Sequence, residues 1–174
     1  MAERERHGRV REDACVGDEP RETRVRTAGR ILLVDARSRV LLLSCTDPSR
    51  PEDGSWWFTP GGGAEAGESV EDAARREALE ETGLDVRALG APVHRRHASF
   101  DFEGVHYEQD DVFFLVRVHS HEVDGAALTD DERRVMTGHR WWAEDELATT
   151  GETVHPAELL DVLRGAGAFA GDAT

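Results

Sequence analysis

Three carboxylates, Glu77, Glu80 and Glu81, lie close together near the end of a segment rich in alanine, leucine, glutamate and arginine. At ~100° per residue in a helix, their spacing places all three on roughly one side. Like charges so arranged repel by about 0.2–0.5 kcal/mol per pair, so they need good solvation or a cation between them. The ordinary alternative is a solvated helix with an i, i+4 ladder of Asp72, Arg76 and Glu80.

The composition and flanks of segment 70–82 predict the helix that positions these carboxylates. Ser69 and Asp72 have the arrangement of a capping box at its start, and Gly83 is a typical stop. One side of the helix begins with small apolar residues and ends with the three carboxylates. A helix that only had to pack would continue the apolar stripe.

A run of three glycines, Gly61–Gly63, follows Pro60 shortly before this helix. Glycines let the backbone turn tightly and bring bare carbonyl and amide groups close to a ligand. On its own such a run indicates only a turn. Here it gains meaning from its spacing to the helix.

The complete pattern resembles the Nudix box of the Nudix hydrolase family. It reads Gly62, five residues, Glu68, seven residues, then Arg76-Glu77-Ala78-x-Glu80-Glu81-x-Gly83-Leu84. Every fixed polar and glycine position of the family pattern is present. The one departure is Ala78, where a larger aliphatic residue is commoner. With its flanking strands and a late tryptophan-rich strand, the resemblance covers residues 26–164.

This resemblance implies an α/β fold, an α/β/α sandwich with a mixed β-sheet. It also implies hydrolysis of a nucleoside diphosphate linked to another moiety, in which water attacks phosphorus and Mg²⁺, or Mn²⁺ in its place, neutralises charge. The implied metal ligands are Glu77, Glu80, Glu81 and the carbonyl of Gly62. The implied structural residues of the box are Gly61, Gly63, Glu68 and Gly83.

Two further roles follow from the same resemblance. Arg76 would orient the carboxylates through charge-assisted hydrogen bonds, with a geometry that lysine cannot copy. The base that activates water is Glu80 or Asp111, which directly precedes the apolar run 112–116, and Glu108 is the next candidate. The acids before that run are equally typical of an exposed loop.

Candidate substrate contacts lie outside the box. Trp57 stands just before the glycines, and of Trp56 and Trp57 at least one is expected to pack beneath the loop. Arg95 lies in a basic stretch with Arg96 and His97, whose side chains could reach a substrate phosphate. Trp141 alternates with Trp142 along a late strand, so one of the pair should be buried and the other should line a surface.

The sequence leaves the identity of the substrate open. Relatives that prefer ADP-ribose or dinucleoside polyphosphates often carry a proline or tyrosine where this chain has Ser99 and Phe100, and coenzyme A and NADH signatures are absent. A nucleotide-sensing module without catalysis is the alternative function, although such domains usually lose a box glutamate. Isomerisation of an isoprenoid diphosphate would need an active-site cysteine, for which Cys45 is poorly placed.

The 174-residue chain is strongly acidic, with a formal net charge of -15 at pH 7. This charge argues against nucleic-acid or anionic-membrane partners and favours a divalent cation at a site for a small phosphorylated substrate. We expect one domain at 25–174 after a disordered extension at 1–24. Without a signal peptide or membrane span, and with two cysteines outside any metal motif, a cytoplasmic protein is expected. A homodimer stays open.

The remaining segments predict the sheet that carries these residues. Strands are expected at 26–35, 40–44, 85–89, 93–100, 106–118 and 139–143, with helices at 144–148 and from Pro156 through Leu163. The first two strands form a hairpin whose continuous apolar residues indicate cover on both faces. Residues 46–55 predict a loop, and 122–138 a long loop or mobile flap.

Overall fold

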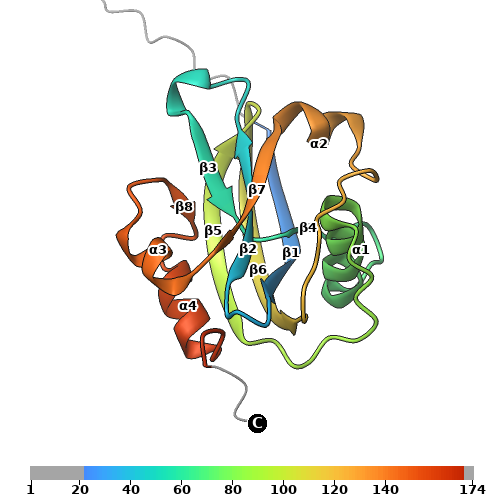
Figure 1. The fold of residues 1–174 in the computed structure, drawn as a ribbon. Coiled ribbons are helices and arrows are strands. Elements are labelled where there is room, and N and C mark those ends of the chain that lie inside the picture. The colour runs from blue at the N-terminus through green and yellow to red at the C-terminus, as the bar shows by residue number, and fades with distance from the viewer. Residues whose placement is uncertain (1–21, 171–174) are drawn as a thin grey trace, which may run out of the picture.

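The computed structural model describes residues 22–170, which form a curled mixed β-sheet with helices on both faces (Figure 1). In chain order the elements are β1 (Thr23–Val34), β2 (Val40–Thr46), the 3₁₀ helix η1 (Pro51–Asp53), β3 (Ser55–Phe58), β4 (Gly61–Gly63), α1 (Val70–Thr82), β5 (His94–Phe102), β6 (Val105–Arg117), α2 (Asp130–Val135), β7 (Met136–Trp142), α3 (Glu144–Thr149), β8 (Val154–His155) and α4 (Leu159–Gly165). The helix α1 covers one face, and α3 and α4 cover the other. The α/β sandwich predicted from the sequence is confirmed.

Strand β1 is central to the sheet, because it pairs with β2, β4 and β6. The strand order is β5-β6-β1-β2-β3-β8, with β4 added to β1 and β7 added to β2. Strand β1 runs parallel to β6 from the Thr23–His106 pair to the Val34–Arg117 pair, whereas β2 and β4 are antiparallel to β1. Since β5 pairs with β6 along the hairpin, three long strands contribute side chains to one continuous wall.

The β1–β2 hairpin is buried on both faces, as its continuous apolar residues predict. Alternate residues of the two strands face opposite sides of the sheet. On the α1 side, Ile31, Leu33 and Leu41 pack with Ala74 and Ala78 of the helix. On the other side, Leu32, Val34, Val40 and Leu42 pack with Trp142, Leu159 and Leu163. The hairpin therefore forms the shared centre of two hydrophobic cores.

The helix α1 begins and ends at the predicted residues. The Ser69 hydroxyl accepts a hydrogen bond from the Asp72 amide at 3.1 Å, which caps the first turn. Gly83 ends the helix in the left-handed conformation, with φ of 75°. Gly29 of β1 lies directly beneath the first turns, and a Cβ atom there would lie under 3.0 Å from the Val70 carbonyl and from Ala74.

Several predicted segments are wrong in detail. Residues 85–89 form no strand because they pair with no neighbour, and Val86 instead packs into the core beneath α1. The predicted flap 122–138 contains α2 and the start of β7, which begins at Met136 because its pairing with β2 continues past a bulge at Ser44/Cys45. The last helix begins at Leu159 because the Pro156 carbonyl closes a turn onto the Leu159 amide.

Both ends of the chain lie outside the described residues. Of the predicted extension at 1–24, residues 1–21 are not described, and Thr23 and Arg24 already belong to β1. Within residues 22–170, no helix has the length and apolar character needed to cross a bilayer.

The approach of α1 to β1 gives a stability prediction. A Gly29→Ala variant should be destabilised by about 1–3 kcal/mol or more, because the added methyl group must push the helix away from the sheet. Chemical denaturation measures the change in the free energy of unfolding. Gly90→Ala is the control, since a Cβ atom at Gly90 meets nothing within 4 Å. Equal stability of the two variants would contradict this account of the helix position.

Candidate active site

The glycine loop, Gly61–Gly63, packs against the end of α1 that carries Glu77 and Glu81. In β4, Gly61 and Gly62 pair with Arg30 and Gly29 of β1, which fixes the loop on the sheet. The Gly61 amide donates a hydrogen bond of 2.7 Å to Oε2 of the buried Glu81. A Cβ atom at Gly62 would overlap the Glu77 carboxylate. The absence of side chains in this loop therefore lets its backbone reach two box glutamates.

Arg76 joins the loop to the helix through a network of hydrogen bonds. Its Nε and Nη2 atoms donate to the two oxygens of Glu68 at 3.0 and 3.1 Å, and Nη2 also donates to the Gly63 carbonyl. Its Nη1 atom donates to Glu77 at 2.9 Å and to Glu80 at 3.0 Å. The hydrogen bonds to Glu68 raise the pKa of Arg76 most strongly, so the guanidinium stays charged. This two-point pairing explains why arginine rather than lysine suits the position.

Three carboxylates converge beside the loop. Oxygen atoms of Glu77, Glu81 and Glu132 all lie within 4.8 Å of one another. Burial raises the pKa of Glu77, and burial followed by repulsion from Glu77 raises the pKa of Glu81 well above its usual value. Glu80, the remaining box glutamate, is outside this group of three and pairs with Arg76. Such crowding of acids, of which Glu132 is only partly buried, is relieved by a cation.

Glu132 is a site residue that the sequence interpretation missed. It lies on α2, inside the segment predicted as a flap. Its Oε2 atom accepts hydrogen bonds from the amide and hydroxyl of Thr129, which completes a capping box at the start of α2. The Thr129-x-x-Glu132 spacing is itself a helix-start signal, so the short helix was readable from the sequence. The proximity of Glu132 to Glu77 and Glu81 could not be predicted from the sequence.

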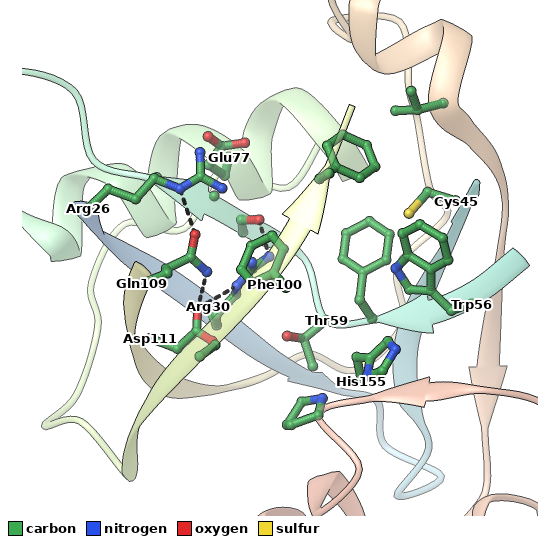
Figure 2. Close-up of a pocket in the computed structure, with 18 of the residues that line it drawn as sticks. Arg26, Arg30, Cys45, Trp56, Thr59, Glu77, Phe100, Gln109, Asp111 and His155 are labelled. Atoms are coloured by element: carbon green, nitrogen blue, oxygen red, sulfur yellow. Dashed lines mark hydrogen bonds and ion pairs between the residues drawn. The ribbon is translucent and has the colours of Figure 1, made fainter. Parts of the chain in front are cut away.

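One cavity of about 850 Å³ lies beside these groups (Figure 2). Neither Arg76 nor Glu80 lines it. The glycine loop, Glu77, Glu81 and Glu132 lie at one part of its surface. The wall built by β1, β5 and β6 contributes Arg26, Arg30, Arg96, Gln109 and Asp111. Aromatic and other flat side chains line a further part, namely Trp56, Phe58, Phe100, Phe102, His155 and Pro156.

The predicted substrate contacts Trp57, Arg95 and Trp141 do not line this cavity. Trp57 packs edge-on against the buried Trp142, with ring centroids 5.3 Å apart, and Arg95 is exposed. Trp141 packs at the margin of the core beneath α1. In β3 and β5 the cavity receives the direct sequence neighbours, Trp56 and Arg96, because adjacent strand residues face opposite sides.

Cys45 also lines the cavity. Burial, followed by repulsion from Glu81, raises the pKa of its thiol to about 12. The thiol is therefore protonated at neutral pH, and a protonated thiol is a poor nucleophile. This environment gives no support to a reaction that depends on a cysteine.

A family model described as the NUDIX domain matches residues 23–163, and the chain therefore belongs to the Nudix hydrolase family. Among solved structures, a MutT NUDIX hydrolase from Burkholderia pseudomallei is 21% identical, with a TM-score of 0.59 over 79% of this chain and 95% of that chain. The MutT protein from Methanosarcina mazei Go1 is 19% identical, with a TM-score of 0.57 over 82% and 93%. A C. elegans Ap4A hydrolase is 17% identical, with a TM-score of 0.54 over 83% and 97%. At identities this low, the structural matches show that the fold is shared and do not identify the substrate.

The convergence of Glu77, Glu81 and Glu132 predicts their part in metal binding. Replacing any of the three by glutamine should weaken Mn²⁺ binding by at least about tenfold, since even residues that only support metal ligands typically contribute about 10- to 100-fold. Titration calorimetry measures the affinity, with Glu71→Gln on the same helix as the control. If Glu80→Gln weakens binding and Glu132→Gln does not, the ligand set implied by the box alone is the correct one.

Proposed function

We propose that this protein hydrolyses a nucleoside diphosphate linked to another moiety, by attack of water on phosphorus with Mg²⁺ as the cofactor. The observation that carries the proposal is the convergence of Glu77, Glu81 and Glu132 beside a glycine loop, within a cavity large enough for a nucleotide. Membership of a family whose members are typically pyrophosphohydrolases supports the same reaction class.

The oxygen atoms of the site fit Mg²⁺, with Mn²⁺ as the alternative, because both ions prefer carboxylate and carbonyl ligands. Glu77, Glu81 and Glu132 would hold the ion, and the Gly62 carbonyl and Glu80 are the further ligands proposed from the box. When bound, the ion neutralises charge on the diphosphate and lowers the pKa of bound water. The crowded carboxylates lose their mutual repulsion at the same time.

Glu80 is our candidate for the base that accepts a proton from water. Its side chain is 30% exposed, against 12% for Glu77, so water reaches it more easily. The Nη1 atom of Arg76 holds its Oε2 atom at 3.0 Å. Because Glu68 fixes Arg76 at two points, the orientation of this carboxylate is set by a guanidinium that is itself held in place.

The flat side chains of the cavity support a nucleoside as part of the substrate. Trp56 packs edge-on near Phe102 and His155, with ring centroids 6.2 and 6.4 Å away. A base that stacks on an aromatic side chain gains about 1–3 kcal/mol. The acidic group and the aromatic group line the same cavity, so one ligand with a diphosphate and a base can contact both.

A panel of diphosphate compounds incubated with Mg²⁺, scored for phosphate against pyrophosphate release, tests the reaction. We expect turnover of at least one nucleoside diphosphate derivative. Glu81→Gln should lower kcat by more than about 100-fold, above the loss typical of a supporting residue, because it removes a buried carboxylate of the acidic group. Glu71→Gln is the matched control. A Mg²⁺-binding protein that turns over no compound would favour the nucleotide-sensing alternative.

A second prediction concerns recognition of the base. Trp56→Leu should raise KM for the best nucleoside substrate by about 5- to 100-fold, because it removes an aromatic face from the cavity. Steady-state kinetics measures KM, and thermal unfolding confirms that the variant is folded. Trp141→Leu is the comparison. A larger rise in KM for Trp141→Leu than for Trp56→Leu would support the assignment made from the sequence.

A further inference from the structure

Asp111 of β6 is buried in the wall of the cavity, with its side chain 6% exposed. Its Oδ1 atom accepts hydrogen bonds from Nε of Arg30 at 3.2 Å and from Nε2 of Gln109 at 2.7 Å. Its Oδ2 atom lies 3.2 Å from Nε of Arg96, at ion-pair distance without hydrogen-bond geometry. Both oxygens therefore face groups supplied by β1, β5 and β6, of which Arg30 and Gln109 are seen beside Asp111 in Figure 2.

These contacts differ from those expected of a base or a metal ligand. A catalytic base needs an oxygen that points at the reacting water, whereas both oxygens of Asp111 face donors of the protein. Asp111 is also outside the group formed by Glu77, Glu81 and Glu132. A buried carboxylate that contacts two guanidinium groups is a structural counter-charge.

Two of the arginines linked to Asp111, Arg30 and Arg26, reach the glycine loop. The Nη1 atom of Arg30 donates to the Gly61 carbonyl at 2.5 Å. Arg26 reaches Asp111 indirectly, since its Nε atom donates to Oε1 of Gln109 at 2.6 Å. Arg26 also lies so close to Gly63 that a Cβ atom there would contact its side chain at 2.9 Å.

Arg26 has the environment of an anion-binding group. Among residues 22–170 it forms no ion pair with a carboxylate, and its Nε atom donates to the neutral Gln109. Its guanidinium carbon lies 4.4 Å from the centre of the Tyr107 ring. Burial, followed by repulsion from Arg30, lowers its pKa. A buried cation in this position is stabilised by a bound anion.

The third arginine, Arg96, lines the cavity and also contacts the exposed Glu158. Its Nη1 atom donates to Glu158 at 3.3 Å, and that carboxylate is 47% exposed. The pair with Glu158 is accordingly solvent-screened and weak. Arg96 can therefore contact a ligand anion without losing a buried partner.

We propose that Asp111 is a positioning residue that holds Arg30 and Arg96 directly, and Arg26 through Gln109, as a clamp for a phosphate group of the substrate. Planar guanidinium groups bind phosphate oxygens with charge-assisted and often bidentate hydrogen bonds. Arg30 and Arg26 contact the same glycine loop as the acidic group, and Arg96 lines the same cavity, so a diphosphate would lie between cations of the protein and a cation held by the acids. This inference rests on the proposed function and specifies how the diphosphate is recognised.

Kinetics of Asp111→Asn separates positioning from base catalysis. The amide keeps the shape of the side chain but removes the charge that holds the arginines. We expect KM to rise by about 10- to 100-fold, with kcat changed by less than about tenfold and the same pH profile. Loss of about 100-fold or more in kcat, together with loss of the acidic limb of the profile, would overturn the proposal and identify a base, because a base loses activity when it is protonated at low pH.

Binding of inorganic pyrophosphate in the presence of Mg²⁺, measured by calorimetry, tests the clamp without turnover. Arg30→Gln, Arg96→Gln and Asp111→Asn should each weaken the affinity by about tenfold or more. Asp110→Asn is the matched control, because the Asp110 side chain is 71% exposed. If Asp111→Asn lowers the melting temperature, Arg96→Gln still tests the clamp, because Arg96 is partly exposed and its replacement should disturb the fold less.

The outcomes of the two experiments are distinguishable from failure of the proposed function. Pyrophosphate binding that depends on Arg30 and Arg96 supports the clamp even if no compound in the panel is hydrolysed. Turnover that is insensitive to all three clamp variants overturns the clamp and leaves the hydrolase assignment intact. The clamp is also overturned if the wild-type protein does not bind pyrophosphate at millimolar concentration, or if Arg95→Gln weakens binding while Arg96→Gln does not.

Discussion

The hydrogen bond from the Gly61 amide to the buried carboxylate of Glu81 is the contact on which the rest of the site depends. It joins two residues 20 positions apart in the chain and holds the glycine loop against the last turn of α1. The contact requires the loop to lie closer to the helix than any side chain would permit, which the glycines of β4 and Gly29 of β1 allow. Gly61–Gly63 also line the cavity, so the loop backbone is available to a ligand there.

The way each buried carboxylate is compensated distinguishes structural acids from functional ones. Burial works against ionisation of Asp35, yet hydrogen bonds from the side chain and backbone of Arg39 and the backbone of Arg37 lower its pKa. Asp111 is likewise surrounded by donors. Glu81 accepts a hydrogen bond from the Gly61 amide, but burial, followed by repulsion from Glu77, raises its pKa well above the usual value. Glu77 is paired with Arg76, but the pKa values of Glu77 and Glu81 are both raised, and a bound cation would relieve their crowding.

The sequence predicts the parts of this site that are local in the chain. The bounds of α1, its cap at Ser69 and the hairpin buried on both faces follow from composition and periodicity. Residues brought in by the sheet were harder to predict. In a strand, a shift of one residue exchanges the two faces, so Trp56 with Trp57, and Arg95 with Arg96, are equivalent until the register is known. Arg30, a charge inside an apolar strand, was a readable signal of a polar wall, but its partner Asp111 lies 81 residues away.

The three acids of the group are positioned by different forces. Glu77 and Glu81 belong to a helix whose inner face is packed against the sheet, so hydrophobic contacts set their positions. The helix α2, which carries Glu132, has no buried residues. It is held instead by the Thr129 cap, by hydrogen bonds from Arg133 to the preceding loop, and by the ion pair of Arg134 with Glu103 in the β5–β6 turn. Polar contacts at partly exposed sites are weaker than packing and open more readily. The position of the third acid therefore depends on surface ion pairs, whereas the first two are fixed by the core.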